Sequence, residues 1–311
     1  MPVDPELQKP LGKLRNLLKL PRQPWPKQVR HDRSGLALLL ACLAFSCVAV
    51  GDERSTSIPH GIVELVSAQE TIQPGNALLL GLHFQLEKGW HIYWINPGDS
   101  GEPPRVEWRL PAGLRAGAIE WPAPSRLPVP PLMDYGYEGE VLLPVSVETA
   151  SGLASGGEAA LAADVKAIVC REVCIPAKAH LALSLPVRAD RPHELGEMRA
   201  MFRAAQQALP KPAPASWRPS ARDLGDHFEL KLNTGHSAST AWFAPLEPLQ
   251  IENAAAQKTV STAAGMRLIL QKSDQLSKPI LHLRGVLVLS QGAFAIDAPV
   301  VPAKRVKEPR R

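Results

Sequence analysis

Cys170 and Cys174 are the residues of this chain whose type and spacing could do chemistry. They lie in the run VCREVCIP, with three residues between them. Such a pair can form a structural disulfide, exchange its disulfide with another protein, or bind a soft metal such as Cu(I). The nine histidines show no paired ligand spacing, so metal binding is the least favoured of the three. We expect no metal and no organic cofactor.

The other two cysteines, Cys42 and Cys47, lie in the apolar run of residues 35–50, which follows a basic segment. This run is shorter than the roughly 20 residues that a membrane-spanning helix needs. Small residues at positions 49–51 fit the site that a signal peptidase reads, so we expect cleavage near Gly51. Residues 1–51 are thus interpreted as a basic lead and export signal. An uncleaved anchor and a lipoprotein signal are less favoured alternatives.

The basic character of the chain is confined to its ends. The formal net charge is +5, and residues 1–51 alone hold eight Lys and Arg against three Asp and Glu. The remaining residues hold equal numbers of acidic and basic side chains, and the tail of residues 303–311 is itself basic. This distribution does not indicate nucleic-acid binding. We expect the exported chain in the periplasm, where cysteine pairs can oxidise and persist.

Short apolar alternations between turn signals predict an all-β protein with two immunoglobulin-like β-sandwich domains. The first domain covers residues 57–188, with strands expected at 61–68, 77–87, 91–95, 106–109, 141–149, 159–169 and 179–187. Residues 192–215 predict a short amphipathic helix and a Pro-rich linker at 211–215. The second domain covers residues 216–302, with strands expected at 228–232, 241–243, 266–271, 280–289 and 293–298.

The cysteine pair is expected to close a tight β-hairpin. A disulfide requires Cα atoms about 4.4–6.8 Å apart, whereas residues four apart along one strand are roughly 13 Å apart. A helix would also bring them together, but Pro176 follows at once and the flanking residues are β-like. We therefore predict that residues 171–173 form the loop. A disulfide across so small a loop stabilises little, so a redox-active pair is favoured over a structural one.

The sequence does not decide how the charged residues of the loop affect the cysteines, and it favours structural roles for the nearby aromatic residues. Arg171 would favour a thiolate and Glu172 would oppose it. Trp90, Tyr93 and Trp94 are expected in the core or at a sheet edge. His91 is expected to be a hydrogen-bonded strand residue rather than a catalytic base.

Two motifs resemble a known family. The run GWHIYWINPGDSG at residues 89–101, together with CREVCIP at residues 170–176, resembles the N-terminal thiol–disulfide interchange domain of DsbD, and in particular its ScsB-type relatives. Residues 242–253 and 283–300 resemble the second β domain of the ScsB-type members. The resemblance covers most of residues 57–302. By this resemblance, residues 134–138 correspond to an aromatic cap loop, whose candidate residues are Asp134, Tyr135, Gly136 and Tyr137.

The resemblance implies a periplasmic reductant relay, a protein-disulfide reductase. A thioredoxin-like protein or domain would reduce the pair, which would then reduce a periplasmic disulfide isomerase or a cytochrome c maturation thioredoxin. By order in the sequence, Cys174 would attack and Cys170 would resolve. Full-length relatives also carry a membrane helix bundle and a thioredoxin domain, so we expect a donor in trans, such as a CcdA-like membrane carrier. The alternative is a non-enzymatic binding or scaffold module with a structural disulfide.

Overall fold

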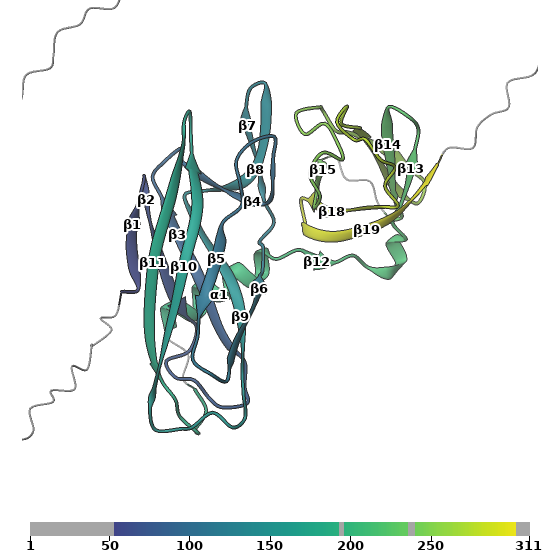
Figure 1. Ribbon diagram of the computed structural model, residues 1–311. Coiled ribbons are helices and arrows are strands. Elements are labelled where there is room, and N and C mark those ends of the chain that lie inside the picture. Colours follow the sequence, from purple (N-terminus) through teal and green to yellow (C-terminus); the bar gives the residue numbers. More distant parts are fainter. Residues whose placement is uncertain (1–52, 193–195, 236–239, 303–311) are drawn as a thin grey trace, which may run out of the picture. The chain divides into compact units, whose positions relative to one another are not determined.

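The computed structural model describes residues 53–192, 196–235 and 240–302 (Figure 1). The predicted export signal, with Cys42 and Cys47, and the basic tail lie outside the described residues. In the part of the chain that is described, no helix is long and apolar enough to cross a membrane. This part is all-β apart from one short α-helix and one 3₁₀ turn, and it forms two immunoglobulin-like β-sandwich domains, as the sequence predicts.

The first β-sandwich consists of two antiparallel sheets (Figure 1). One sheet has the strand order β1-β2-β3-β9-β6, and these strands span Ser55–Ile58, Gly61–Ser67, Leu78–Leu86, Glu140–Thr149 and Leu114–Ile119. The other has the order β11-β10-β4-β8-β7, and these strands span Cys174–Pro186, Glu158–Cys170, His91–Gly98, Leu132–Glu138 and Ser125–Val129. Strand β5 (Arg105–Arg109) pairs with β10 outside this order.

Alternation of apolar and polar residues builds the core of this sandwich. Every second residue of β10 from Leu161 to Val169 is buried, and Leu80, Leu82 and Phe84 of β3 are fully buried. Successive side chains of a strand point to opposite faces, so each sheet turns one apolar face inward. The inward faces of the two sheets form one apolar cluster.

The predicted helix forms as α1 (Gly196–Ala208), which packs against β9 of the first sandwich. Its buried residues Phe202 and Ala205 form a small apolar cluster with Leu142 and Ala68. The predicted linker starts with an ordered element, because β12 (Lys211–Pro212) pairs with β19 (Gly292–Pro302). A 3₁₀ turn, Ala215–Trp217, follows it.

The second β-sandwich has the strand order β15-β18-β19-β13-β14-β17-β16. Apart from β19, these strands span Ala241–Pro245, His282–Leu289, Ser220–Asp223, His227–Leu232, Gly265–Gln271 and Lys258–Thr262. Strand β19 pairs with β18 up to Pro299 and with β13 from Val300 onward, so it links the two parts of the domain. Phe228, Phe243 and Leu287 lie in the common core.

Strand β8 differs from the sequence prediction in a way that affects the site. Residues 134–137 were expected in a loop, but they lie in β8, paired with β4 on one side and β7 on the other. Gly136 fits there because a Cβ atom at this position would overlap the backbone carbonyl of Ile92. Long-range pairing therefore overrides the turn-like composition of this segment. Strands β1, β6, β7, β12, β13 and β16 were also not predicted.

Candidate functional site

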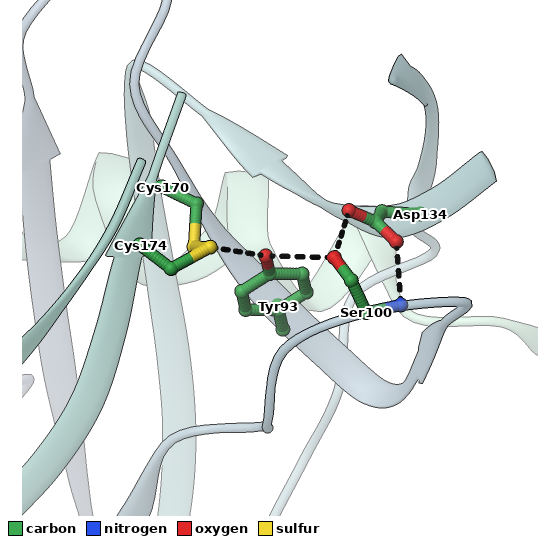
Figure 2. The surroundings of a disulfide bond; sticks show 5 residues. All are labelled: Tyr93, Ser100, Asp134, Cys170 and Cys174. Atoms are coloured by element: carbon green, nitrogen blue, oxygen red, sulfur yellow. Dashed lines mark hydrogen bonds between the residues drawn. A yellow bond between two sulfur atoms is a disulfide. The ribbon is translucent and has the colours of Figure 1, made fainter. Parts of the chain in front are cut away.

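Cys170 and Cys174 are joined by a disulfide at the tip of the β10–β11 hairpin (Figure 2). Cys170 ends β10, Cys174 begins β11, and the two residues lie directly opposite each other with Cα atoms 4.2 Å apart. The loop is closed by the backbone N–H of Arg171, which donates to the carbonyl of Val173 at 3.2 Å. The predicted hairpin, with its three-residue loop, is confirmed.

The two cysteines differ sharply in their access to solvent. Cys170 is only 1% exposed, whereas Cys174 and the whole loop of residues 171–173 are exposed. A thiolate or disulfide of another protein can therefore approach Cys174, while Cys170 is shielded from direct attack. This asymmetry is what a pair with one attacking and one resolving cysteine requires.

The charged side chains of the hairpin loop interact with each other and with aromatic rings. The Arg171 guanidinium lies over the Trp90 ring, with Cζ 5.0 Å from the ring centroid. Its Nε is 3.8 Å from the carboxylate of Glu172, and the Trp90 ring stacks on His60 with centroids 3.6 Å apart. The cation–π contact anchors the positive charge at the base of the exposed tip.

A chain of polar groups leads from Cys174 to a buried carboxylate, as Figure 2 shows. The hydroxyl of Tyr93 lies 3.5 Å from Sγ of Cys174 and 3.3 Å from Oγ of Ser100. Ser100 donates its hydroxyl to Asp134 at 2.7 Å and its backbone N–H to the same carboxylate at 2.9 Å. Burial raises the pKa of Tyr93; the hydrogen bond with Ser100 opposes this and the charge of Asp134 adds to it. Tyr93 thus stays a phenol, and its single proton can be donated either to Oγ of Ser100 or, when Cys174 is a thiolate, to its sulfur.

The irregular end of β4 places Ser100 and Tyr93 next to each other. The pairing of β4 with β8 shifts between Tyr93 and Gly98. Asn96 stabilises the shift by accepting the N–H of Gly98 at 3.1 Å. Gly98 and Gly101 both adopt a positive φ, and a Cβ atom on Gly101 would overlap the Tyr93 ring. The glycines of the NPGDSG run therefore let this loop lie directly on Tyr93.

His91 lies on the other side of the buried cysteine. It pairs with Cys170 across the β4–β10 ladder, and its ring contacts Tyr93 edge to face with centroids 5.1 Å apart. His91 is 4% exposed, and its Nε2 atom is buried without a hydrogen-bond partner among the described residues. The expectation of a hydrogen-bonded strand histidine is therefore wrong for Nε2.

The four residues predicted as a cap lie at or beside the site, but in β8. Asp134 reaches the site through Ser100, and Gly136 pairs with Tyr93. Tyr137 is buried and donates its hydroxyl to the carbonyl of Pro122 at 2.7 Å. Burial raises its pKa well above the ordinary value. Tyr135 is fully buried, and its ring packs edge to face on Trp94.

Residues of the second sandwich contact the loop and strand that carry the site. Asn253 donates its side-chain N–H to Asp99 at 2.7 Å and accepts the hydroxyl of Tyr135 at 3.1 Å. Its carbonyl accepts a hydrogen bond from Arg126 at 3.0 Å, and Trp242 stacks on Tyr135 with centroids 6.0 Å apart. Asn253 thus bridges the loop that holds Ser100 and the strand that holds Asp134.

Sequence reasoning missed the roles of Tyr93, Ser100 and His91. The motif at residues 89–101 contains all three residues, but the residues that their side chains contact, such as Asp134 and Cys174, lie far away in the sequence. Among the described residues, no group of three or more His, Cys, Asp or Glu side chains could hold a metal ion. The chemistry available at this site is that of a disulfide, a phenol, an imidazole and a carboxylate.

Comparisons with known proteins agree with this geometry. The profile of the family described as thiol:disulfide interchange protein DsbD, N-terminal, matches residues 63–186, which contain the disulfide. The crystal structure of the N-terminal periplasmic domain of ScsB from Proteus mirabilis aligns with a TM-score of 0.63 at 17% identity, over 80% of this chain and 97% of that one. This match shows a shared fold that extends beyond residues 63–186.

Two further comparisons add no argument. The crystal structure of the periplasmic chaperone SfaE covers 76% of this chain and 99% of its own at 10% identity, but with a TM-score of only 0.21. No curated protein sequence matches the chain.

The family profile, the ScsB fold and the disulfide at the hairpin tip lead to one conclusion: residues 63–186 form a domain of the DsbD N-terminal type.

Proposed function

We propose that this protein is a reductant relay that passes electrons from a thioredoxin-like donor to disulfides of client proteins. Thiol–disulfide interchange is the activity for which the matched family is described. The observation that supports the relay most directly is the asymmetry of the pair. Cys174 is exposed and has a phenol 3.5 Å from its sulfur, whereas Cys170 is buried behind it.

The exchange proceeds through a mixed disulfide. In the reduced protein, the Cys174 thiolate attacks a client disulfide, and one client sulfur leaves as a thiolate. Cys170 then attacks Sγ of Cys174, so that the Cys170–Cys174 bond forms and the bond to the client breaks. The client gains two electrons and the pair is oxidised. The Tyr93 hydroxyl stabilises Cys174 while it carries a negative charge, because hydrogen bonds to charged groups are stronger than neutral ones.

The donor in this proposal is a thioredoxin-like protein or domain, which would receive electrons from a CcdA-like membrane carrier. The clients are periplasmic disulfide isomerases or cytochrome c maturation thioredoxins. The periplasmic location is supported by the predicted export signal and by the ScsB domain, which is described as periplasmic. We assign the predicted cap residues separate roles. Asp134 orients Ser100 and Tyr93, while Tyr135, Gly136 and Tyr137 hold β8 against β4.

Single-cysteine variants test the proposal. With a thioredoxin as the partner, Cys170→Ser should accumulate a mixed disulfide on a non-reducing gel, because Cys174 can attack but cannot be resolved. Cys174→Ser should accumulate less, since Cys170 is buried. The opposite result would exchange the two roles. A reduction potential of the pair well below about −300 mV would instead favour a structural disulfide in a non-enzymatic scaffold.

A further inference from the structure

Four side chains lie on one face of the cysteine-bearing sheet. Cys174 faces Cys170 across β10 and β11, and Cys170 faces His91 across β10 and β4. Tyr93 is two residues from His91 on β4, so both side chains point to the same face. The contacts of Tyr93 with both the His91 ring and the Cys174 sulfur agree with this arrangement. His91 therefore lies beside Cys170, on the side opposite Cys174.

This position makes His91 the cross-strand neighbour of Cys170 on β4. Directly opposite residues of an antiparallel ladder have Cβ atoms about 4.5–5.5 Å apart. The Cys170 side chain needs such a neighbour, because a resolving thiol must lose its proton before it attacks. Cys170 is 1% exposed, so solvent has little access to take that proton. A base inside the protein has to do so.

The other groups around His91 are unsuited to this role. Tyr93 is a weak acid whose pKa is raised, foremost by burial, and its oxygen already interacts with Ser100. The Asp134 carboxylate accepts two hydrogen bonds from Ser100. Glu138 lies opposite His91 on β8 and is exposed, on the side away from Cys170. His91 offers a buried nitrogen, Nε2, with no partner among the described residues.

We propose that His91 is the general base that takes the proton of Cys170 when Cys170 closes the disulfide. This assignment rests on the proposed function. The proton of the Cys170 thiol moves to Nε2 of His91, and the Cys170 sulfur attacks Sγ of Cys174. The bond between Cys174 and the client breaks, and the client sulfur leaves with the electron pair as a thiolate. The imidazolium passes its proton to water after the client has left.

The electrostatic surroundings of His91 suit both states of such a base. Burial lowers the pKa of His91 below its ordinary value of 6.5, so the ring is neutral and can accept a proton at neutral pH. The charges of Asp134 and Glu138 on β8 act in the opposite direction. They stabilise the imidazolium once the proton has been transferred.

A two-step exchange with a small aromatic disulfide separates the roles of the residues. The reduced full chain, carrying Cys42→Ser and Cys47→Ser so that only Cys170 and Cys174 can release thionitrobenzoate, is mixed with dithiobis(nitrobenzoate) in stopped flow. The first thionitrobenzoate is released when Cys174 attacks, and the second is released when Cys170 closes the disulfide. His91→Gln and His91→Phe should still release the first equivalent at the wild-type rate, because Cys174 is exposed, and urea titration checks that both variants are folded. Both should slow the second release by about 10²-fold or more, the usual contribution of a general base.

The pH profile and a matched histidine complete the experiment. The second release from the wild-type chain should slow as the pH falls through the pKa of His91 and level off above it. In the His91 variants it should instead keep rising with pH. His83→Gln is the control, because His83 is also buried but lies on β3 of the other sheet, bonded to Glu64 and Glu140. Equal second-release rates and profiles in wild type and His91 variants would overturn the role of His91. Absence of the first release from the wild-type chain would instead overturn the proposed function.

Discussion

Replacing Tyr93 by Phe removes one hydroxyl group from the disulfide site and leaves the aromatic ring. That hydroxyl lies 3.5 Å from Sγ of Cys174 and 3.3 Å from Oγ of Ser100. A hydrogen bond to a charged group contributes about 1.5–3 kcal/mol. The lower end applies here, because Cys174 is exposed and the contact with sulfur is long. A loss of about 1.5 kcal/mol lowers the ratio of thiolate to thiol at Cys174 by about tenfold at a given pH.

The effect on the reaction rate is smaller than this ratio and changes sign with pH. A less stabilised thiolate is a better nucleophile, and with a Brønsted coefficient of 0.4–0.5 it gains about threefold in reactivity. Below the pKa of the thiol, Tyr93→Phe should therefore react about threefold more slowly, and above it about threefold faster. Above the pKa of the thiol, where the reduced form is a thiolate, the same loss destabilises the reduced form, so the reduction potential should become about 30 mV more negative.

Alkylation of Cys174 by iodoacetamide over a range of pH measures this effect in a Cys170→Ser background. The curves with Tyr93 and with Phe at this position should cross. Tyr137→Phe is the matched control, because it removes the same group from a buried tyrosine that donates to Pro122. It should leave the profile of Cys174 unchanged. Superimposable profiles for Tyr93→Phe and its parent would refute a thiolate-stabilising role for the phenol.

Three further predictions concern stability. Phe202→Ala should lower the free energy of unfolding by about 3 kcal/mol in a urea titration, because it leaves a cavity where α1 packs against the sheet. The alkylation of Cys174 should be unchanged. Gly101→Ala should cost about 1–3 kcal/mol in the same titration and should also alter alkylation, because the new Cβ atom would overlap the Tyr93 ring; a neutral outcome would contradict the described loop. Because the folded protein lowers the pKa of His91, the unfolded chain binds more protons below 6.5, so stability should fall as the pH drops below this value. His91→Gln should weaken that dependence, and an unchanged slope would contradict it.

The hairpin and the strand alternation could be predicted because they depend on neighbouring residues. The spacing of Cys170 and Cys174, followed by Pro176, leaves few local conformations that allow a disulfide. Strand β8 could not be predicted in the same way. Its Asp and Gly residues are typical of turns, and only pairing with β4 and β7 makes it a strand.

The surroundings of the sulfurs depend on register between distant strands. Ser100 and Asp134 are 34 residues apart in the chain, and Tyr93 and Cys174 are 81 residues apart. A shift of one residue in the β4–β10 pairing would turn His91 to the opposite face. The sequence motifs therefore identified the segments that form the disulfide site, but the order of side chains across β11, β10 and β4 appears only in the folded sheet.

The location of the disulfide at the end of a long ladder has a consequence for repeated turnover. The pairing of β10 with β11 continues without interruption from Cys170–Cys174 to Glu158–Pro186. When the sulfur–sulfur bond opens, backbone hydrogen bonds along this ladder still hold the two strands together. Opening so short a loop also frees little chain entropy. In the proposed relay, the protein would therefore cycle between its two oxidation levels without refolding, and the redox equilibrium with a partner would depend on the two sulfur atoms rather than on the stability of the sandwich.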